Sequence, residues 1–159
     1  MKWCCIICLC CLPLRHLSVN SGYGYRIHPV TGKYIMHSGV DLKAGNDTVF
    51  AIMNGVAFQT GYDRLLGLHI RLNHPGEISS IYGHLSQVWV VPGDTVSMGQ
   101  AIGITGSTGR VTGEHLHFAI TCHKLYINPI KFLYELLINQ QNEQKFQSIT
   151  SSAFRKADY

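Results

Sequence analysis

The sequence predicts a mainly β fold built as one domain. The chain has 159 residues, of which 46% are hydrophobic, and this length and composition suit a single domain with its own core. Sixteen glycines recur in turn-like stretches such as "HPVTGK", "VVPGD" and "TGSTG". Short apolar stretches lie between these turns, and only one stretch places its apolar residues at helical spacing. This pattern favours many short strands over long helices.

The first 17 residues are typical of a signal-like leader. "MKWCCIICLCCLPLR" carries one lysine followed by roughly a dozen apolar residues, the length of a signal-peptide core and too short to span a bilayer. We therefore expect export to an extracytoplasmic location, the periplasm or cell envelope, without a stable membrane span. The stretch has no clean small-residue cleavage site, so a mis-started or truncated leader stays open as the alternative.

The cysteines exclude two kinds of site from the rest of the chain. Five of the six cysteines lie in the leader, and only Cys122 lies beyond it. The body therefore has no internal disulfide framework and no zinc site built on cysteines.

The body of the chain divides into strands, one helix and a tail. Residues 18–128 contain the strand-like stretches "KYIMHSGVDL", "TVFAIMNGVAFQTGYD", "GLHIRLNH", "ISSIYGHLS", "VWVVPGDTVSMGQAIGITG" and "HLHFAITC". Residues 131–138, "KFLYELLI", predict one short C-terminal helix. Residues 139–159 are polar and lack an apolar stripe, which predicts a disordered tail.

The charge of the chain gives no support to nucleic-acid binding. The formal net charge is +4, and no run of Lys and Arg interleaves with aromatic residues. A mild positive charge is compatible with an anionic surrounding such as a cell wall.

Two histidines share one face of a predicted strand in "GEHLHF". Successive strand residues point to opposite faces, so His115 and His117 lie together while Leu116 and Phe118 face the core. On a helix the two imidazoles would lie about 200° apart and could not work together. A pair of histidines on a solvated face is the structural alternative.

Two further motifs offer metal ligands and acid–base groups. In "HSGVD", His37 and Asp41 would be about 13 Å apart on a straight strand, but Ser38 and Gly39 allow a bend that brings them together. Two imidazoles and a carboxylate with an open fourth position form the ligand set of a catalytic zinc. In "IYGHLS", His84 lies among apolar residues, and taken alone it would be interpreted as a structural histidine. Asp41, taken alone, would be interpreted as the cap of a turn.

The motifs "GYRIHPVTGKYIMHSGVDL", "YGHLS", "GDTVSMGQAIGITGSTGRVTGEHLHF" and "INPIKFL" resemble the lysostaphin-type zinc metallo-endopeptidases that cut peptidoglycan peptides. The resemblance runs from about residue 21 to residue 133 and assigns residues 18–138 to one peptidase domain. It implies an antiparallel β-sheet or sandwich with a narrow zinc-bearing groove.

The resemblance also implies roles for individual residues. His37, Asp41 and His117 would bind one zinc ion, and His84 and His115 would stand beside the water that attacks the peptide. The histidines suit proton transfer because an unperturbed imidazole has a pKa of about 6.5. Which histidine takes which role stays open. The expected substrate is a peptidoglycan peptide, and the protein is expected to act as a monomer.

The chain departs from the family pattern at two positions. Ala119 replaces the glutamate of the common "HLHFE", and Glu114 stands where proline often precedes the HLH motif. Neither change removes an expected ligand, but Ala119 shares the face of His115 and His117, so a contact that tunes the metal is expected to be missing.

Two other functions compete with hydrolysis. Some relatives of these endopeptidases have lost metal ligands and activate cell-wall amidases, whereas this chain keeps every expected ligand. The stretch "VPGDTVSMGQAIG" also resembles lipoyl and phosphotransferase carrier domains, which have no use for the HxxxD pair. The bond that would be cut stays open between a direct cross-link from D-alanine to a diamino acid and a glycine bridge.

Several other polar residues are assigned less specific positions. Arg26, His28 and Tyr34 are expected either to line the groove or to lie in an ordinary surface turn. His69 alternates with apolar neighbours and is expected to be structural, and His74 precedes Pro75 and is expected at the surface.

Overall fold

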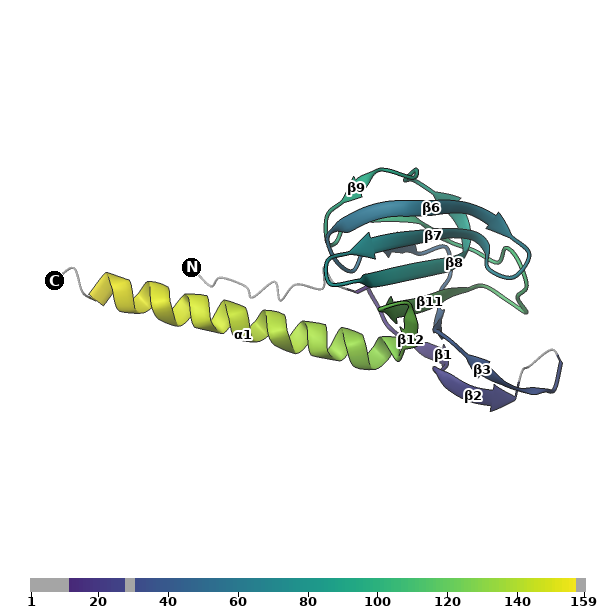
Figure 1. Cartoon of the computed structure of the whole chain (residues 1–159), viewed down its shortest axis with the longest axis horizontal. Helices are drawn as coiled ribbons and strands as arrows, with labels where there is room; N and C mark the ends of the chain where they lie inside the picture. The colour runs from purple at the N-terminus through teal and green to yellow at the C-terminus, as the bar shows by residue number, and fades with distance from the viewer. Residues whose placement is uncertain (1–11, 28–30, 157–159) are drawn as a thin grey trace.

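The chain folds around a large antiparallel β-sheet (Figure 1). The computed structural model describes residues 12–27 and 31–156, and the side chains of the helix only as far as residue 142. Its elements are β1 (Val19–Ser21), β2 (Gly24–Ile27), β3 (Tyr34–His37), β4 (Val40–Lys43), β5 (Thr48–Phe50), β6 (Gly55–Asp63), β7 (Gly67–His74), β8 (Ile78–Val88), β9 (Thr95–Val96), β10 (Ala101–Thr105), β11 (His115–Cys122), β12 (Leu125–Ile127) and α1 (Pro129–Lys156).

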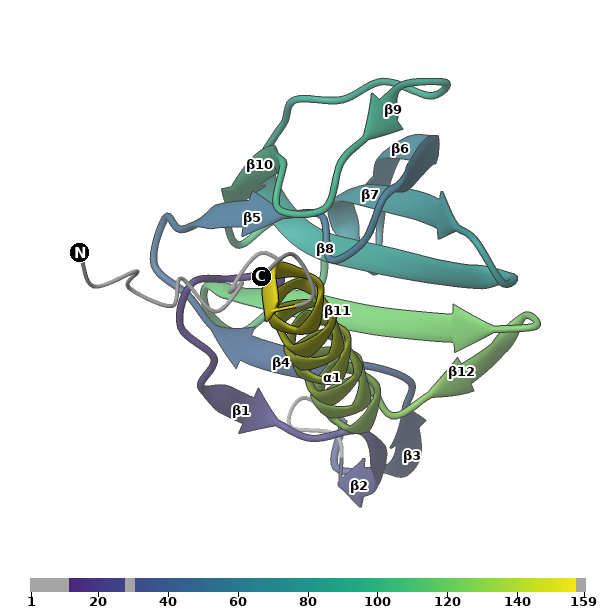
Figure 2. The same ribbon diagram turned by 90° about the vertical axis from the view of Figure 1, so that its left-hand side faces the viewer.

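The sheet confirms the predicted mainly β, antiparallel fold. Ten strands form one sheet, whose main path is β1-β4-β11-β8-β7-β6-β9. Strand β10 pairs with β5 and with the end of β8, and β12 pairs with β11. Strands β2 and β3 form a separate hairpin that projects from this sheet (Figures 1 and 2).

Strand β11 separates the core from the functional face, as its alternation predicts. Leu116, Phe118 and Ile120 are completely buried and belong to the main hydrophobic cluster. His115 and His117 alternate with them and point to the opposite face. The strand ends in a two-residue turn at His123 and Lys124, whose φ angles of 49° and 66° are those of a type I′ hairpin.

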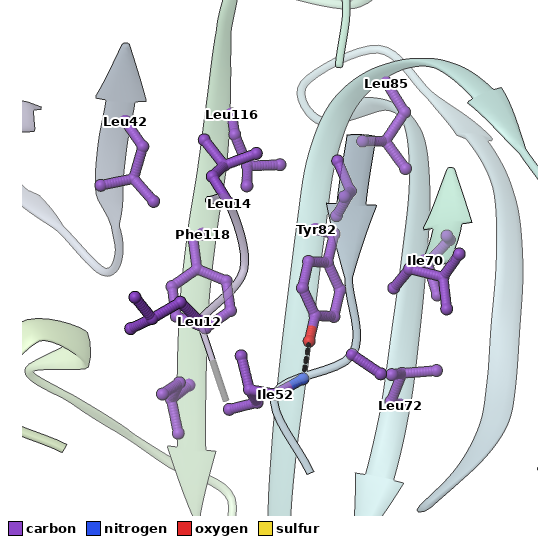
Figure 3. Packing of buried hydrophobic residues seen from close by; sticks show 14 of the residues in the cluster. Leu12, Leu14, Leu42, Ile52, Ile70, Leu72, Tyr82, Leu85, Leu116 and Phe118 are labelled. Carbon is purple, nitrogen blue, oxygen red and sulfur yellow. Dashed lines mark hydrogen bonds between the residues drawn. The ribbon is translucent and has the colours of Figure 1, made fainter. Parts of the chain in front are cut away.

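The core lies on the inner face of the curved sheet (Figure 3). Tyr82 and Phe118 are its largest fully buried side chains, and their rings meet with centroids 5.4 Å apart. The Tyr82 hydroxyl accepts a hydrogen bond of 3.2 Å from the backbone N–H of Ile52 (Figure 3), so its polar end is satisfied inside the core.

The first described residues pack against the sheet, upstream of the domain boundary that the sequence analysis placed at residue 18. Residues 1–11 lie outside the described part, but Leu12 and Leu14 are buried in the main cluster (Figure 3). The Phe50 N–H donates to the Pro13 carbonyl at 3.0 Å, and the Lys43 N–H donates to the Ser18 carbonyl at 2.8 Å. The side chains of Leu12 and Leu14 are therefore part of the folded core, although the sequence analysis placed them in the leader.

The C-terminal helix is longer than predicted. α1 begins at Pro129, where the side chain of Asn128 accepts hydrogen bonds from the backbone N–H groups of Ile130 and Lys131. Residues 139–156, predicted as part of a disordered tail, continue the same helix away from the sheet (Figure 1), while residues 157–159 lie outside the described part. No glycine or proline follows Pro129 in this helix, so local propensity sustains it without an apolar stripe.

His74 is buried rather than at the surface. It is the last residue of β7, only 7% exposed, and Pro75 begins the turn that follows it. Its Nδ1–H donates to the Asn54 carbonyl at 2.9 Å, and its Nε2 lies 2.7 Å from the Ser80 hydroxyl. His69 is also buried, as expected for a structural histidine. In the described part of the chain, no helix is long and apolar enough to cross a membrane.

Candidate metal centre

Three of the predicted ligands come together on the outer face of the sheet. Asp41 on β4 and His117 on β11 are direct cross-strand partners, so both side chains emerge on the same face. His37 ends β3, and the bend at Ser38 and Gly39 turns it back toward them, as the sequence suggested. His37 Nε2 lies 3.2 Å from Asp41 Oδ1 although the two residues are four apart in sequence.

The three ligand atoms are spaced as a small metal ion requires. His117 Nδ1 lies 2.9 Å from Asp41 Oδ1 and 3.2 Å from His37 Nε2. Ligands 2.0–2.1 Å from a tetrahedral zinc would be about 3.3 Å apart. All three side chains are largely buried, with 10–13% of their side-chain surface exposed. The residues therefore fit a zinc-sized ion in both donor type and spacing.

The charge of Asp41 also suits a cation. Burial raises the pKa of Asp41, but the adjacent His117 and His37 rings outweigh burial and hold this pKa well below its usual range. The Arg26 Nη2 donates a hydrogen bond of 3.3 Å to the other carboxylate oxygen, Oδ2, and so helps to fix the orientation of the carboxylate. Asp41 is consequently ionised at neutral pH, as a metal ligand must be.

Backbone carbonyls orient the rings of His37, His84 and His115. The Nδ1 atoms of these rings donate hydrogen bonds to the carbonyls of Gly22 at 2.8 Å, Thr108 at 2.8 Å and Gly113 at 2.9 Å. Because a carbonyl can only accept, Nδ1 carries the proton in each neutral ring and Nε2 keeps a lone pair. Sequence reasoning missed these carbonyls, although two of them lie in the glycine-rich stretch "TGSTGRVTGEH".

His84 and His115 lie beside the cluster of His37, Asp41 and His117. Their rings are in edge contact with centroids 4.7 Å apart, and the His84 ring lies 5.8 Å from that of His117. His115 Nε2 lies 3.6 Å from Asp41 Oδ1. All five residues line one open cavity of about 350 Å³.

An irregular backbone directs His84 into this cavity. Its φ is 62°, in the left-handed region that non-glycine residues seldom adopt. The register of β8 against β7 shifts between Ile70 and Leu68, and the His84 N–H bonds to the Leu66 carbonyl at 2.7 Å instead of to the ladder. Burial lowers the pKa of His84 to about 4, so the ring is neutral at pH 7.

The other predicted groove residues have different positions. Arg26 lines the cavity and bonds Asp41, so the groove alternative is correct for it. Tyr34 is 71% exposed and does not line this cavity, and His28 lies outside the described residues. The walls also include Leu65, Leu66 and Arg110, which the sequence did not single out. A larger cavity of about 730 Å³, lined by Leu14, Lys43 and Phe50, holds none of the five site residues.

The antiparallel sheet thus carries a candidate metal site made of two histidines and one aspartate. Two more histidines line the same cavity, as in a metal-dependent hydrolytic site. The sequence matches Peptidase family M23 over residues 35–129, and the chain belongs to this family. The family resemblance found in the sequence is thereby confirmed.

Named relatives and solved structures agree with this assignment. Peptidoglycan DD-endopeptidase ShyC of Vibrio cholerae is 36% identical over 119 residues, which are 74% of this chain and 28% of ShyC. The catalytic domain of lysostaphin from Staphylococcus simulans superposes with a TM-score of 0.66 at 34% identity, covering 74% of this chain and 92% of that domain. A zinc-containing peptidase from Vibrio cholerae gives a TM-score of 0.67 at 30% identity, covering 70% and 35% of the two chains. The chain thus spans just over a quarter of the length of ShyC.

Proposed function

We propose that this protein is a zinc-dependent endopeptidase that hydrolyses peptide cross-links of bacterial peptidoglycan. The observation that carries the proposal is the convergence of His37, Asp41 and His117 on one point, with two more imidazoles at the same cavity. The names of ShyC and of the zinc-containing peptidase support the substrate and the metal. Since peptidoglycan lies outside the cytoplasm, the proposal includes an extracytoplasmic location and retains export through the leader.

The ligand set divides the work between protein and metal. A zinc ion held by His37, Asp41 and His117 would activate a water molecule and polarise the scissile carbonyl. His84 is neutral at pH 7 and presents an unprotonated Nε2, so it can accept a proton or a hydrogen bond at that atom. His115 presents its Nε2 to the same space and can exchange a proton with the leaving amine.

The carbonyls of Thr108 and Gly113 prevent the two catalytic rings from turning. Each ring keeps its Nε2 directed into the cavity because its Nδ1–H is already bonded. The edge contact between the rings restricts them further. The cavity can therefore receive a peptide between acid–base groups that need no rearrangement.

The test separates metal binding from catalysis with three variants of the full chain. His117→Ala should lower the zinc content and abolish cleavage of purified sacculi, because it removes one of three ligands. His115→Ala and His84→Ala should keep about one zinc per chain, since the ligand set is intact, while cleavage falls by about 10²-fold or more.

Elemental analysis and mass spectrometry of released muropeptides measure the two properties, with circular dichroism as a control for folding. Well-folded wild-type protein that neither contains nor takes up zinc would contradict the metal proposal. If the wild type released no fragments but stimulated a cell-wall amidase, the activator alternative would be correct instead.

A further inference from the structure

A second cavity lies directly beside the three candidate metal ligands, His37, Asp41 and His117. It has a volume of about 550 Å³ and shares His117, Leu65 and Leu66 with the cavity that holds the catalytic histidines. A peptide bound across the cluster would therefore have a residue next to the scissile bond within reach of this second cavity.

The second cavity has two arginines on its walls. Arg64 follows β6 in the turn to β7, and Arg71 emerges from β7. The Nε of Arg71 is buried and has no hydrogen-bond partner. In the described part of the chain neither arginine forms an ion pair within 4.0 Å, although the charge of Arg71 helps to lower the pKa of Asp63. A buried Nε–H without an acceptor costs stability, and a ligand at Arg71 could supply that acceptor.

The one acidic residue of the cavity is already engaged. The Asp63 carboxylate accepts hydrogen bonds from the N–H groups of Leu65 at 2.8 Å and Leu66 at 2.6 Å. Its other oxygen lies 3.7 Å from the buried His69 ring. Two arginines against one occupied aspartate leave the cavity with a net positive charge.

Ala119 keeps this charge available. Arg71, Ile81 and Ala119 form one row across β7, β8 and β11. Ala119 lies two residues after His117 on β11 and faces the same side of the sheet. Its small side chain lines the cavity and offers no hydrogen-bond acceptor. A carboxylate at position 119 could pair with Arg71 within the protein, but alanine cannot.

We propose that the cavity of Arg64, Arg71 and Ala119 binds a free carboxylate of the substrate, on the residue next to the scissile bond. This rests on the proposed function, and it deepens it by naming which cross-link is preferred. The planar guanidinium of Arg71 matches a carboxylate through paired N–H donors.

The two candidate cross-links differ in this group. In a direct cross-link from D-alanine to a diamino-dicarboxylic acid, the carbon that bears the scissile nitrogen also bears a carboxylate. A glycine bridge has no carboxylate at the bonds within it. The cavity therefore favours the direct cross-link over the glycine bridge.

The experiment compares two cross-linked dimers that differ only in this carboxylate, one free and one converted to the primary amide. The wild type should cleave the free acid with a kcat/KM about 10–100-fold higher than the amide, the usual effect of a charge-assisted hydrogen bond. Equal kcat/KM values for the two dimers would overturn the carboxylate site while leaving the proposed function intact.

Variants locate the effect in the cavity. Arg71→Gln should lose the preference by raising KM for the acid, with little change on the amide. Ala119→Glu should do the same by giving Arg71 an acceptor within the protein, and it serves if Arg71→Gln fails to fold. Arg15→Gln removes an equal charge at an exposed residue of the other, larger cavity and should keep the preference. Retention of the preference in both folded cavity variants would overturn the assignment.

Binding separates a failure of this site from a failure of the proposed function. The folded His115→Ala variant, loaded with zinc, should bind the free-acid dimer about tenfold or more tightly than the amide in calorimetry. If the wild type cleaved neither dimer, the proposed function would fail, and equal binding of both would then overturn the carboxylate site as well.

Discussion

The position of the His117 ring depends on the absence of a side chain at Gly39. A Cβ added at this residue would lie 2.7 Å from the Phe118 carbonyl oxygen and 2.8 Å from the Nε2 and Cε1 atoms of His117. The carbonyl belongs to the sheet and cannot give way, so the His117 ring would have to move. The glycine is needed here for close approach rather than for an unusual φ.

Gly39→Ala should therefore weaken zinc binding by about tenfold or more, the scale seen when the support of a metal ligand is lost. Competition with a chromophoric chelator measures the affinity. Gly45→Ala is the control, because nothing lies within 4 Å of a Cβ at that position. Unchanged affinity in a folded Gly39→Ala protein would show that the His117 ring does not depend on this contact.

At the scale of elements, a buried row of polar groups joins β7 and β8. His74 Nε2 lies 2.7 Å from the Ser80 hydroxyl, which lies 3.1 Å from the Tyr82 hydroxyl. Burial lowers the pKa of His74 despite its bond to the Asn54 carbonyl, and burial raises the pKa of Tyr82 to about 12. The row is satisfied with His74 neutral, since Nε2 can then accept from Ser80.

His74 should make the fold less stable in acid. Its pKa is lower in the folded state than the 6.5 of an unperturbed histidine, so the unfolded state binds the proton more readily. The free energy of unfolding should therefore fall as the pH drops through 6.5, and His74→Gln should reduce this dependence.

Urea unfolding between pH 8 and pH 5.5, with a chelator present to exclude metal effects, measures the slope. His16→Gln, a change at an exposed residue, is the control. If His74→Gln had the slope of the wild type, the proton would be taken up elsewhere.

The elements differ in how far the sequence predicts them. The alternation of β11 predicted its two faces because each residue has one fixed direction on a strand. The meeting of His37 with Asp41 was predictable from the bend at Gly39, whereas the left-handed turn at His84 depends on the Leu66 carbonyl, which is remote in sequence. The length of α1 was missed because its second half has few apolar residues, and the pattern used to recognise helices requires them.

At the scale of the whole molecule, the segment from Leu12 to Leu14 belongs to the core. Leu14 is 2% exposed, while Leu17, three residues later, is 37% exposed and lies outside the main cluster. A mature protein cut at residue 17 would lose the buried part of this segment. The proposed export would therefore be compatible with this fold only if any cleavage fell before Leu12.

Leu14→Ala should lower the free energy of unfolding by about 2–5 kcal/mol, the usual cost of removing a buried leucine side chain. Leu17→Ala should change it by about 0.5 kcal/mol or less, as expected for a surface residue. Denaturant titration of both variants gives the comparison. Equal stabilities would mean that the segment contributes nothing to the folded domain.

A metal ion bound at His37 would stabilise the β2–β3 hairpin. Among the residues that the structure describes, the hairpin pairs with no strand of the large sheet, and an isolated two-stranded hairpin is only marginally stable in water. It nevertheless carries His37, whereas Asp41 and His117 belong to the large sheet. A bound ion would thus link the hairpin to the large sheet. Part of the free energy of metal binding would be used to order the hairpin. Removing the metal should speed amide hydrogen exchange in β2 and β3 while the centre of β11 stays protected.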